Sequence, residues 1–333
     1  MQTAFFETRA TRLLGIAHPV MQAPLGGVAR AELAAAVSNA GGLGMLAMIR
    51  MPPAFIRQQI RRTRELTQRP FGVNIVPAVL PESDFAAQLD ACMSERVEVL
   101  SLFWCGDAAG YVSRCHQAGM KVMLQAGSSD EARRAADAGV DIIVAQGVEA
   151  GGHVRGEVGL MPLLAGVLDA VSPTPVLAAG GIADGRGLAA ALALGADGVC
   201  IGTRFLATPE CEAHPDYKQR VLRANETDTV RCKTFHVGWE DAAHRVLKNA
   251  LTEGEPPPPE PIGQIQRPDG SWQEIAPFMS TPPTFKVQGR TELMANYAGQ
   301  GVGLVTQMSP AGKIVEQVVE EAQRALRGIP WRQ

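Results

Sequence analysis

The chain has 333 residues, of which 46% are hydrophobic and 20% are charged, so it can bury a sizeable core. The formal net charge of −3 and the lack of a dense basic patch argue against a nucleic-acid-binding protein. No apolar run reaches the ~18 residues that span a bilayer. The six cysteines form no CxxC pair and no zinc-ligand spacing, so we expect free thiols, no bound metal and a cytoplasmic location.

Short apolar runs alternate with amphipathic segments from residue 19 to about residue 205. The runs are apolar throughout, as expected for parallel strands that are covered on both faces. They predict strands over 19–23, 42–47, 71–76, 97–103, 121–126, 141–146, 175–180 and 198–203. Eight β–α units in sequence predict an α/β fold, a (β/α)8 TIM barrel. A doubly wound open sheet is the alternative, but its usual nucleotide motifs, GxGxxG and the P-loop, do not occur.

The pattern changes after residue 205, so residues 1–205 are assigned to the barrel and 206–285 to an insertion or cap subdomain. The cap is expected over or beside the barrel mouth, and a dimer contact is the alternative. Helices within about 286–333 are expected to close the barrel. Local patterns predict a loop that leads into a helix over 209–224, a hairpin over 266–275 and helices over 291–305 and 310–326. His236 and Tyr297 are expected to have structural roles, and contact with the substrate is the alternative.

Glycines follow the last two predicted strands. Gly180-Gly181 follows the seventh strand, and Gly202-Thr203 ends the eighth. In parallel barrels these two strand ends commonly hold a phosphate. Glycine lets backbone N–H groups approach an anion closely, and the Thr203 hydroxyl adds a donor. These segments therefore predict a phosphate site, and ordinary tight turns are the alternative.

The first, third and fifth predicted strands carry residues suited to a flat ring. Ala23-Pro24-Leu25 offers a small apolar surface with backbone polar groups. Asn74 and Gln125 can each donate and accept hydrogen bonds, as the edge of a planar heterocycle requires. For both amides, a polar residue satisfied inside the barrel is the alternative.

The sixth predicted strand leads into the sequence QGVEAGGHVRG, residues 146–156, which places His153 after two glycines. The glycines remove bulk, so a flat ligand could approach the backbone while the imidazole faces a substrate. An unperturbed imidazole has a pKa of about 6.5 and can serve as base or acid near neutral pH. His153 is therefore the candidate catalytic residue, and the remaining histidines are expected to be structural or exposed.

A set of segments extends over nearly the whole chain: HPVMQAPLGG (18–27), NAGGLGML (39–46), RPFGVNI (69–75), AQGVEAGGH (145–153), PVLAAGGIADGRG (175–187), LGADGVCIGTRFLATPE (194–210) and YAGQGVGL (297–304). Together they resemble the nitronate monooxygenase family, formerly called 2-nitropropane dioxygenases. The flavin-dependent enoyl-acyl-carrier-protein reductases and some NADH:quinone reductases are similar over the same segments.

The resemblance implies an FMN-binding barrel with His153 as the catalytic histidine. It implies flavin contacts from Ala23, Pro24, Leu25, Asn74, Gln125 and Gly151, and phosphate contacts from Ala179, Gly180, Gly181, Gly202 and Thr203. Some relatives carry lysine where Gln125 stands, and Gln125 can offer only a neutral donor. The implied partners are a small-molecule substrate and O2, with no nucleic acid or membrane partner, and a homodimer is compatible with the sequence.

The reaction implied by the resemblance is the oxidation of an alkyl nitronate, for example propionate 3-nitronate, by O2 to a carbonyl compound and nitrite. The first alternative is an NAD(P)H-dependent FMN reductase that acts on an enoyl thioester or a quinone. The second alternative is a flavin-binding sensory module without catalytic activity. Anaerobic reduction of the flavin by a pyridine nucleotide or by a nitronate would distinguish the three.

Overall fold

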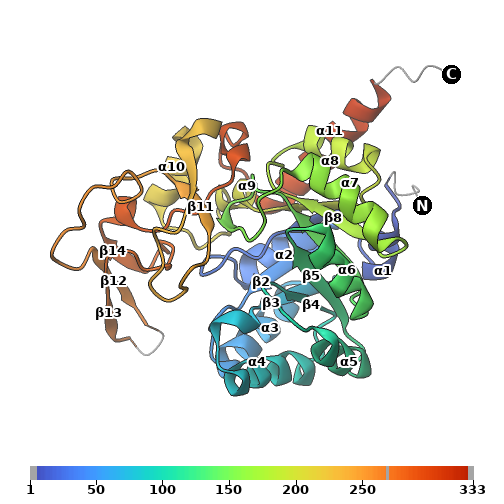
Figure 1. Cartoon of the computed structure of the whole chain (residues 1–333), viewed down its shortest axis with the longest axis horizontal. Helices are drawn as coiled ribbons and strands as arrows, with labels where there is room; N and C mark the ends of the chain where they lie inside the picture. The colour runs from blue at the N-terminus through green and yellow to red at the C-terminus, as the bar shows by residue number, and fades with distance from the viewer. Residues whose placement is uncertain (1–5, 268–269, 329–333) are drawn as a thin grey trace.

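The computed structural model describes residues 6–267 and 270–328. Its main sheet has the strand order β1-β9-β8-β6-β5-β4-β3-β2, with every pair parallel. A parallel bridge between Met21 and Leu43 joins the first strand to the last, so the sheet closes into a barrel (Figure 1). The strands are β1 (Val20–Gln22), β2 (Gly44–Ala47), β3 (Phe71–Ile75), β4 (Val99–Leu102), β5 (Lys121–Ala126), β6 (Ile142–Gln146), β8 (Val176–Ala179) and β9 (Gly198–Ile201). The predicted TIM barrel and its eight strands are confirmed.

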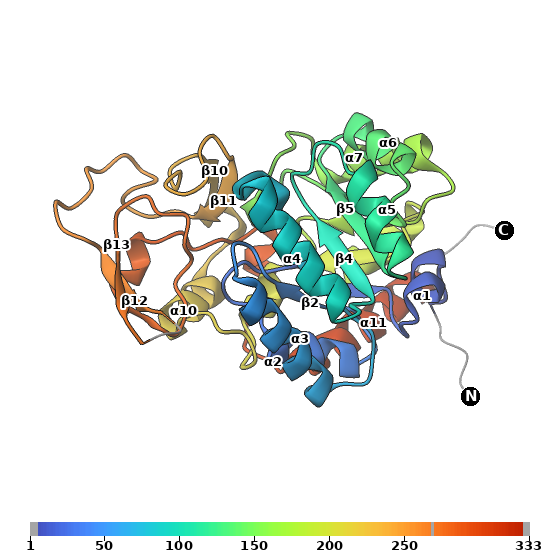
Figure 2. The same ribbon diagram turned by 90° about the horizontal axis from the view of Figure 1, so that it is seen from below.

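Helices cover the outside of this barrel (Figure 2). They are α2 (Ala31–Asn39), α3 (Pro53–Leu66), α4 (Glu82–Ser94), α5 (Ala109–Gln117), α6 (Ser129–Asp137), α7 (Leu160–Val171), α8 (Gly185–Ala193), α9 (Thr203–Leu206) and α11 (Ala311–Arg327). The last of these confirms the helix predicted over 310–326. It buries an apolar stripe that includes Ile314, Val315 and Val318, and it packs against α8 and α2.

Apolar side chains fill both faces of the barrel sheet. A cluster that includes Met45, Met123 and Val144 fills the barrel interior, and a larger cluster lies between the strands and the helices. Both faces therefore exclude water, and this explains why the strand sequences are apolar throughout instead of alternating. The exceptions are polar residues near the carboxyl ends of strands, including Asn74 and Gln146.

The segment from residue 207 to residue 310 forms a cap at one end of the barrel. It contains α10 (Pro215–Arg223), β10 (Thr229–Cys232), β11 (His244–Leu247), β12 (Gly263–Gln266), β13 (Trp272–Ile275), β14 (Val287–Gly289) and the 3-10 helices η2 (Glu226–Asp228), η3 (Thr291–Leu293) and η4 (Gln300–Leu304). Strands β12 and β13 form the predicted hairpin, although residues 268–269 lie outside the described residues. Strands β12 to β14 lie at the opposite end of the molecule from α1 (Arg9–Leu14) (Figures 1 and 2).

The barrel contributes a short strand of its own to the cap. Strand β7 (Gly152–His153), which follows β6, pairs antiparallel with β11, and His153 lies opposite His244 in the register. Strand β11 also pairs with β10. The candidate catalytic residue is therefore held between the barrel loop and the cap.

The helix predicted over 291–305 does not form, because this segment contains only the short 3-10 helices η3 and η4. Glycine has a poor helix propensity, and three glycines occur between residues 299 and 303. Two of them pack against other backbone segments. A Cβ atom on Gly299 would lie 2.7 Å from the Glu149 carbonyl oxygen, and one on Gly301 would lie 2.9 Å from the Gly181 carbonyl oxygen. These glycines let the segment lie directly on the glycine-rich strand ends.

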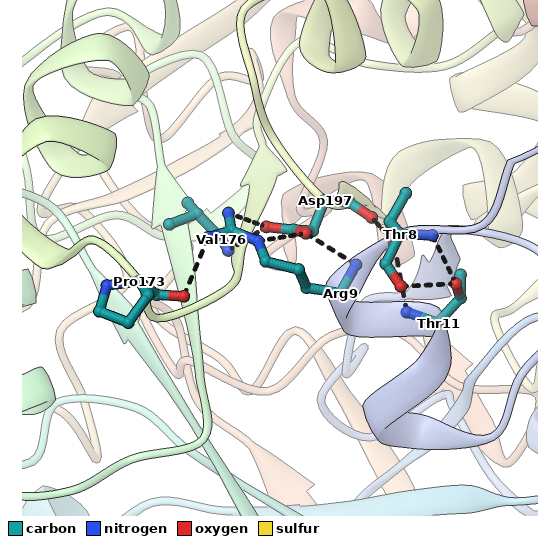
Figure 3. Close-up of polar contacts among 6 residues, drawn as sticks. All are labelled: Thr8, Arg9, Thr11, Pro173, Val176 and Asp197. Atoms are coloured by element: carbon teal, nitrogen blue, oxygen red, sulfur yellow. Dashed lines mark hydrogen bonds and ion pairs between the residues drawn. The ribbon is translucent and has the colours of Figure 1, made fainter.

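A paired charge fixes α1 to the amino-terminal end of the barrel (Figure 3). The Asp197 carboxylate accepts hydrogen bonds from the Arg9 backbone N (3.1 Å), from the Arg9 Nε (3.0 Å) and from the Val176 backbone N (3.0 Å). The Arg9 Nη2 completes an ion pair at 2.6 Å, and the Thr8 hydroxyl donates to the Asp197 carbonyl at 2.7 Å. Every one of these contacts lies at the end of the barrel away from the cap.

Candidate active site

A cavity of about 320 Å³ lies between the carboxyl ends of the barrel strands and the cap. Active sites of parallel barrels occur at this end. All the residues predicted for the site line this cavity: Ala23, Pro24, Leu25, Asn74, Gln125, Gly151, His153, Ala179, Gly180, Gly181, Gly202 and Thr203. They come from six different strand ends, which the closed barrel brings together.

The glycines after β8 and β9 present free backbone donors to the cavity. Gly180 has a φ of +112° and Gly181 a φ of +69°, a backbone conformation that favours glycine. The backbone N–H groups of Gly180, Gly181 and Gly202 donate no hydrogen bond within the described part of the chain. The Thr203 Oγ1 accepts from the Gly299 N–H at 2.9 Å, so its own hydrogen remains available to a ligand. Such a group of donors suits a phosphate.

The residues expected around a flat ring also line the cavity, and Ala23 and Leu25 lie next to Gly202. The Asn74 Nδ2 donates to the Ser101 carbonyl at 3.0 Å, so its Oδ1 is left for a ligand. The Gln125 side chain is half-buried and makes no hydrogen bond to a described residue. At β1, the Ala23 carbonyl accepts from the Gln22 side chain, which orients the start of the Ala-Pro-Leu segment.

Aromatic side chains surround the His153 imidazole. The ring stacks on Trp239 of the cap, with centroids 3.9 Å apart and an interplanar angle of 24°. The centroids of Tyr297 and His244 each lie 5.5 Å away, and Trp104 presents its edge at 6.5 Å. Trp239 and Tyr297 also line the cavity. Most of the rings that contact the imidazole therefore come from the cap.

Burial keeps this imidazole neutral. The His153 Nε2 is buried and has no hydrogen-bond partner within the described residues. Burial, with smaller contributions from His244 and the Arg50 charge, lowers the pKa of His153 to about 3. The expectation that His153 ionises near neutral pH is therefore wrong for the ligand-free protein. The ring is a neutral group that can accept a proton or share a hydrogen bond.

A second buried, unpartnered atom belongs to Gln146, which also lines the cavity. Gln146, the last residue of β6, donates from its Nε2 to the His153 carbonyl at 3.1 Å. Its Oε1 is buried and has no partner within the described residues, and the residue lines the cavity. A buried acceptor without a donor is unfavourable by about 1–3 kcal/mol. His153 and Gln146 thus each bring an unpartnered polar atom to residues that line one cavity.

A side chain is unfavourable at each of the two glycines before His153, for a different structural reason. A Cβ atom on Gly151 would lie 2.5 Å from the Gly299 backbone N, so the chain packs too closely there for any side chain. Gly152 has open space around its Cβ position but a φ of +79°. The segment therefore serves close packing as well as ligand access, and the sequence interpretation recognised only ligand access.

Sequence reasoning missed Arg50 and Trp239, and it underestimated Tyr297. Arg50 lies three residues after β2, so the strand-end rule that found the other barrel residues could have found it. Trp239 and Tyr297 come from the cap, and no local pattern places them near the barrel. His236, by contrast, stacks on Phe278 and does not line the cavity.

The cavity fits the cofactor that the resemblance implies. The free backbone amides after β8 and β9 match a phosphate, and the side-chain amides of Asn74 and Gln125 match a ring edge with donors and acceptors. No cluster of three or more His, Cys, Asp or Glu residues that could hold a metal occurs in residues 6–267 and 270–328. Within the same residues, no helix is both long and apolar enough to cross a bilayer.

Comparison with known proteins places this chain in a family. The family model described as nitronate monooxygenase matches residues 7–321. The (3aS,4S,5R,7aS)-5-hydroxy-7a-methyl-1-oxo-octahydro-1H-indene-4-carboxyl-CoA dehydrogenase of Rhodococcus jostii is 34% identical and covers 95% of each chain.

Two solved structures are similar along nearly their whole length. The nitroalkane oxidase of Streptomyces ansochromogenes superposes with a TM-score of 0.79 at 31% identity, covering 96% of this chain and 99% of its own. FabK of Thermotoga maritima gives a TM-score of 0.78 at 31% identity, covering 96% and 97%. The chain belongs to the nitronate monooxygenase family, and it is an oxidoreductase.

Proposed function

We propose that this protein is an FMN-dependent nitronate monooxygenase, which oxidises alkyl nitronates such as propionate 3-nitronate with O2 to a carbonyl compound and nitrite. The observation that carries the proposal is the neutral imidazole of His153, a residue that lines a cavity with free backbone amides and whose Nε2 has no hydrogen-bond partner among the described residues. Bound FMN would supply the redox chemistry, accepting electrons from the nitronate and delivering them to O2.

His153 is the proposed catalytic residue. A neutral imidazole with a free ring nitrogen can take the α-proton of a nitroalkane and so generate the nitronate within the site. It can also donate a hydrogen bond to a bound nitronate oxygen from the tautomer that carries its proton on the Nε2. The low pKa of His153 keeps the ring neutral in the ligand-free protein, but it also makes the ring a weaker base. A bound anionic substrate would raise this pKa and so favour the proton transfer. Stacking on Trp239 holds the ring in place for either role.

The barrel loops are proposed to hold the cofactor. The backbone N–H groups of Gly180, Gly181 and Gly202, with the Thr203 hydroxyl, would bind the phosphate. The Ala23-Pro24-Leu25 segment would contact the face of the ring system, and Asn74 and Gln125 would bind polar atoms on its edge. These groups orient the cofactor and exclude water, and they take part in no proton transfer.

An NAD(P)H-dependent FMN reductase is the second candidate function. It is favoured by the likeness to FabK of Thermotoga maritima over 96% of this chain and by the relative named as a CoA-thioester dehydrogenase. A reductase of an enoyl thioester or a quinone would use the same cavity, so the fold does not separate the two functions.

Anaerobic reduction of the flavin separates the two candidates. We expect propionate 3-nitronate to bleach the bound flavin rapidly, while NADH and NADPH leave it oxidised for much longer. Rapid bleaching by a pyridine nucleotide alone would establish the reductase instead. Release of the cofactor by acid, followed by chromatography against FMN and FAD, tests the identity of the flavin in the same preparation.

A further inference from the structure

One charged side chain stands out in the cavity. Among the described residues that line it, Arg50 is the only charged residue, and no acidic residue is present. Arg50 follows β2 and has a φ of +55°, an uncommon backbone conformation for a residue with a side chain. Uncommon conformations of this kind concentrate at ligand sites.

The guanidinium of Arg50 has no counter-ion. It makes no ion pair with any described residue, and its one hydrogen bond runs from the Nη2 to the Gly238 carbonyl of the cap. Gly238 precedes Trp239, which stacks on His153. Burial lowers the pKa of Arg50, but arginine remains charged at neutral pH. A half-buried cation beside a neutral imidazole therefore leaves a positive potential in the cavity.

We propose that Arg50 binds a planar XO2⁻ group of the substrate, so that the substrates of this site are small organic anions. Carboxylates and nitronates share this geometry, two oxygens on one planar centre, which a guanidinium can bind through two parallel N–H groups. The N–H groups of Arg50 not used by Gly238 are available for this purpose. The inference deepens the proposed function by naming the group that selects its substrate.

The alternative role of Arg50 is purely structural, because its bond to Gly238 joins the loop after β2 to the cap. Arg220 provides a matched control. It is also half-buried, and its guanidinium donates to the Glu292 carbonyl (3.2 Å) and the Lys248 carbonyl (3.0 Å). Burial lowers its pKa as it does that of Arg50, but Arg220 does not line the cavity. Loss of packing and loss of anion binding can thus be separated.

The first experiment measures binding alone. The flavin-loaded protein is titrated with propionate and with its neutral isostere propionamide, and binding is followed by calorimetry and by the flavin absorbance. We expect propionate to bind the native protein more tightly than propionamide, and Arg50→Gln to weaken propionate binding about tenfold or more. Propionamide binding should change little, and Arg220→Gln should resemble the native protein. Equal binding of the two compounds to the native protein, or an equal loss for both in Arg50→Gln, would overturn the proposal.

The second experiment identifies which anionic group Arg50 contacts. Ethylnitronate carries only the nitronate, whereas propionate 3-nitronate carries a carboxylate as well. If Arg50 binds the carboxylate, Arg50→Gln raises the KM of propionate 3-nitronate alone, and if it binds the nitronate, both KM values rise by a similar factor. A change of kcat without any change of KM in either substrate would contradict anion binding.

The two proposals fail separately. If neither nitronate is oxidised but propionate binding still depends on Arg50, then the anion site stands and the proposed monooxygenase activity is rejected. If nitronates are oxidised but Arg50→Gln changes neither propionate binding nor KM, then the activity stands and the anion site is rejected.

Discussion

Buried polar groups have partners within the protein at one end of the barrel and lack them at the other. At the amino-terminal end, the buried Asp197 is paired with Arg9 and also accepts a backbone N–H (Figure 3). At the carboxyl end, Arg50 has no counter-ion, and the buried His153 Nε2 and Gln146 Oε1 have no partner among the described residues. The Asp197 carboxylate at one end is satisfied by the protein itself, whereas these three groups at the other end lack a counter-ion or a hydrogen-bond partner among the described residues.

This difference follows from the costs of burying polar groups. Each unpartnered buried donor or acceptor destabilises the folded protein by about 1–3 kcal/mol, so such groups are rare without a ligand. The charges of Asp197 and Arg9 at the amino-terminal end are paired with each other, so we expect them to contribute to stability. Substitutions at the two ends should therefore separate stability from activity.

The largest effect is expected at His153. Replacement His153→Ala removes the proposed base, and general-base catalysis contributes about 10²–10⁴-fold to rate. We expect nitrite release from a nitroalkane to fall by that factor, while the flavin content per chain stays close to the native value. Full turnover by a flavin-loaded His153→Ala protein would reject the catalytic assignment.

At Asp197, at the amino-terminal end of the barrel, we expect a large effect on stability and none on turnover. Replacement Asp197→Ala leaves the Val176 N–H without its acceptor, while the partly exposed Arg9 can regain water. The free energy of unfolding should fall by about 1–3 kcal/mol, measured by urea denaturation. Turnover per folded, flavin-loaded molecule should be unchanged.

The exposed pair between Arg12 and Glu7 provides the control for Asp197. Both side chains are more than half exposed, at 59% and 62%, and such pairs contribute little. Arg12→Gln should therefore change the free energy of unfolding by less than about 0.5 kcal/mol. A similar effect of both substitutions would show that burial at Asp197 is not the cause.

The smallest effect is a pH dependence of stability at the carboxyl end. The groups that face the His153 ring are Trp239, Trp104, Tyr297, His244 and Arg50. Folding lowers the His153 pKa from the ordinary 6.5 to about 3, so between these values the unfolded chain binds more protons than the folded protein.

The free energy of unfolding should consequently fall as the pH is lowered from 6.5 towards 3. By pH 5, His153 should account for about 1–2 kcal/mol of this decrease. The measurement compares the flavin-free native protein with His153→Gln at pH 7 and pH 5. The variant should lose less stability over this interval, because it lacks the imidazole that takes up a proton on unfolding. The contribution of the buried His244 is common to both proteins. An equal loss in both would show that His153 titrates normally.

Much of the barrel part of the cavity could be predicted, because the residues that line the mouth of a parallel barrel follow the carboxyl ends of its strands. Gly180, Gly202, Asn74 and Gln125 were found from their places in eight apolar runs, since closure brings all carboxyl ends to one rim. Arg50 obeys the same rule but was overlooked because it stands three residues beyond its strand.

The sequence by itself determined the closed parallel barrel and the strand ends, with His153 among them, that line the cavity, because these follow from local apolar runs and glycines. Only the tertiary structure decided the state of that histidine and its surroundings. Trp239 and Tyr297 are 86 and 144 residues away in the chain, and their packing buries the imidazole and lowers its pKa. Burial and charge separation depend on which distant segments meet, and no local pattern contains that information.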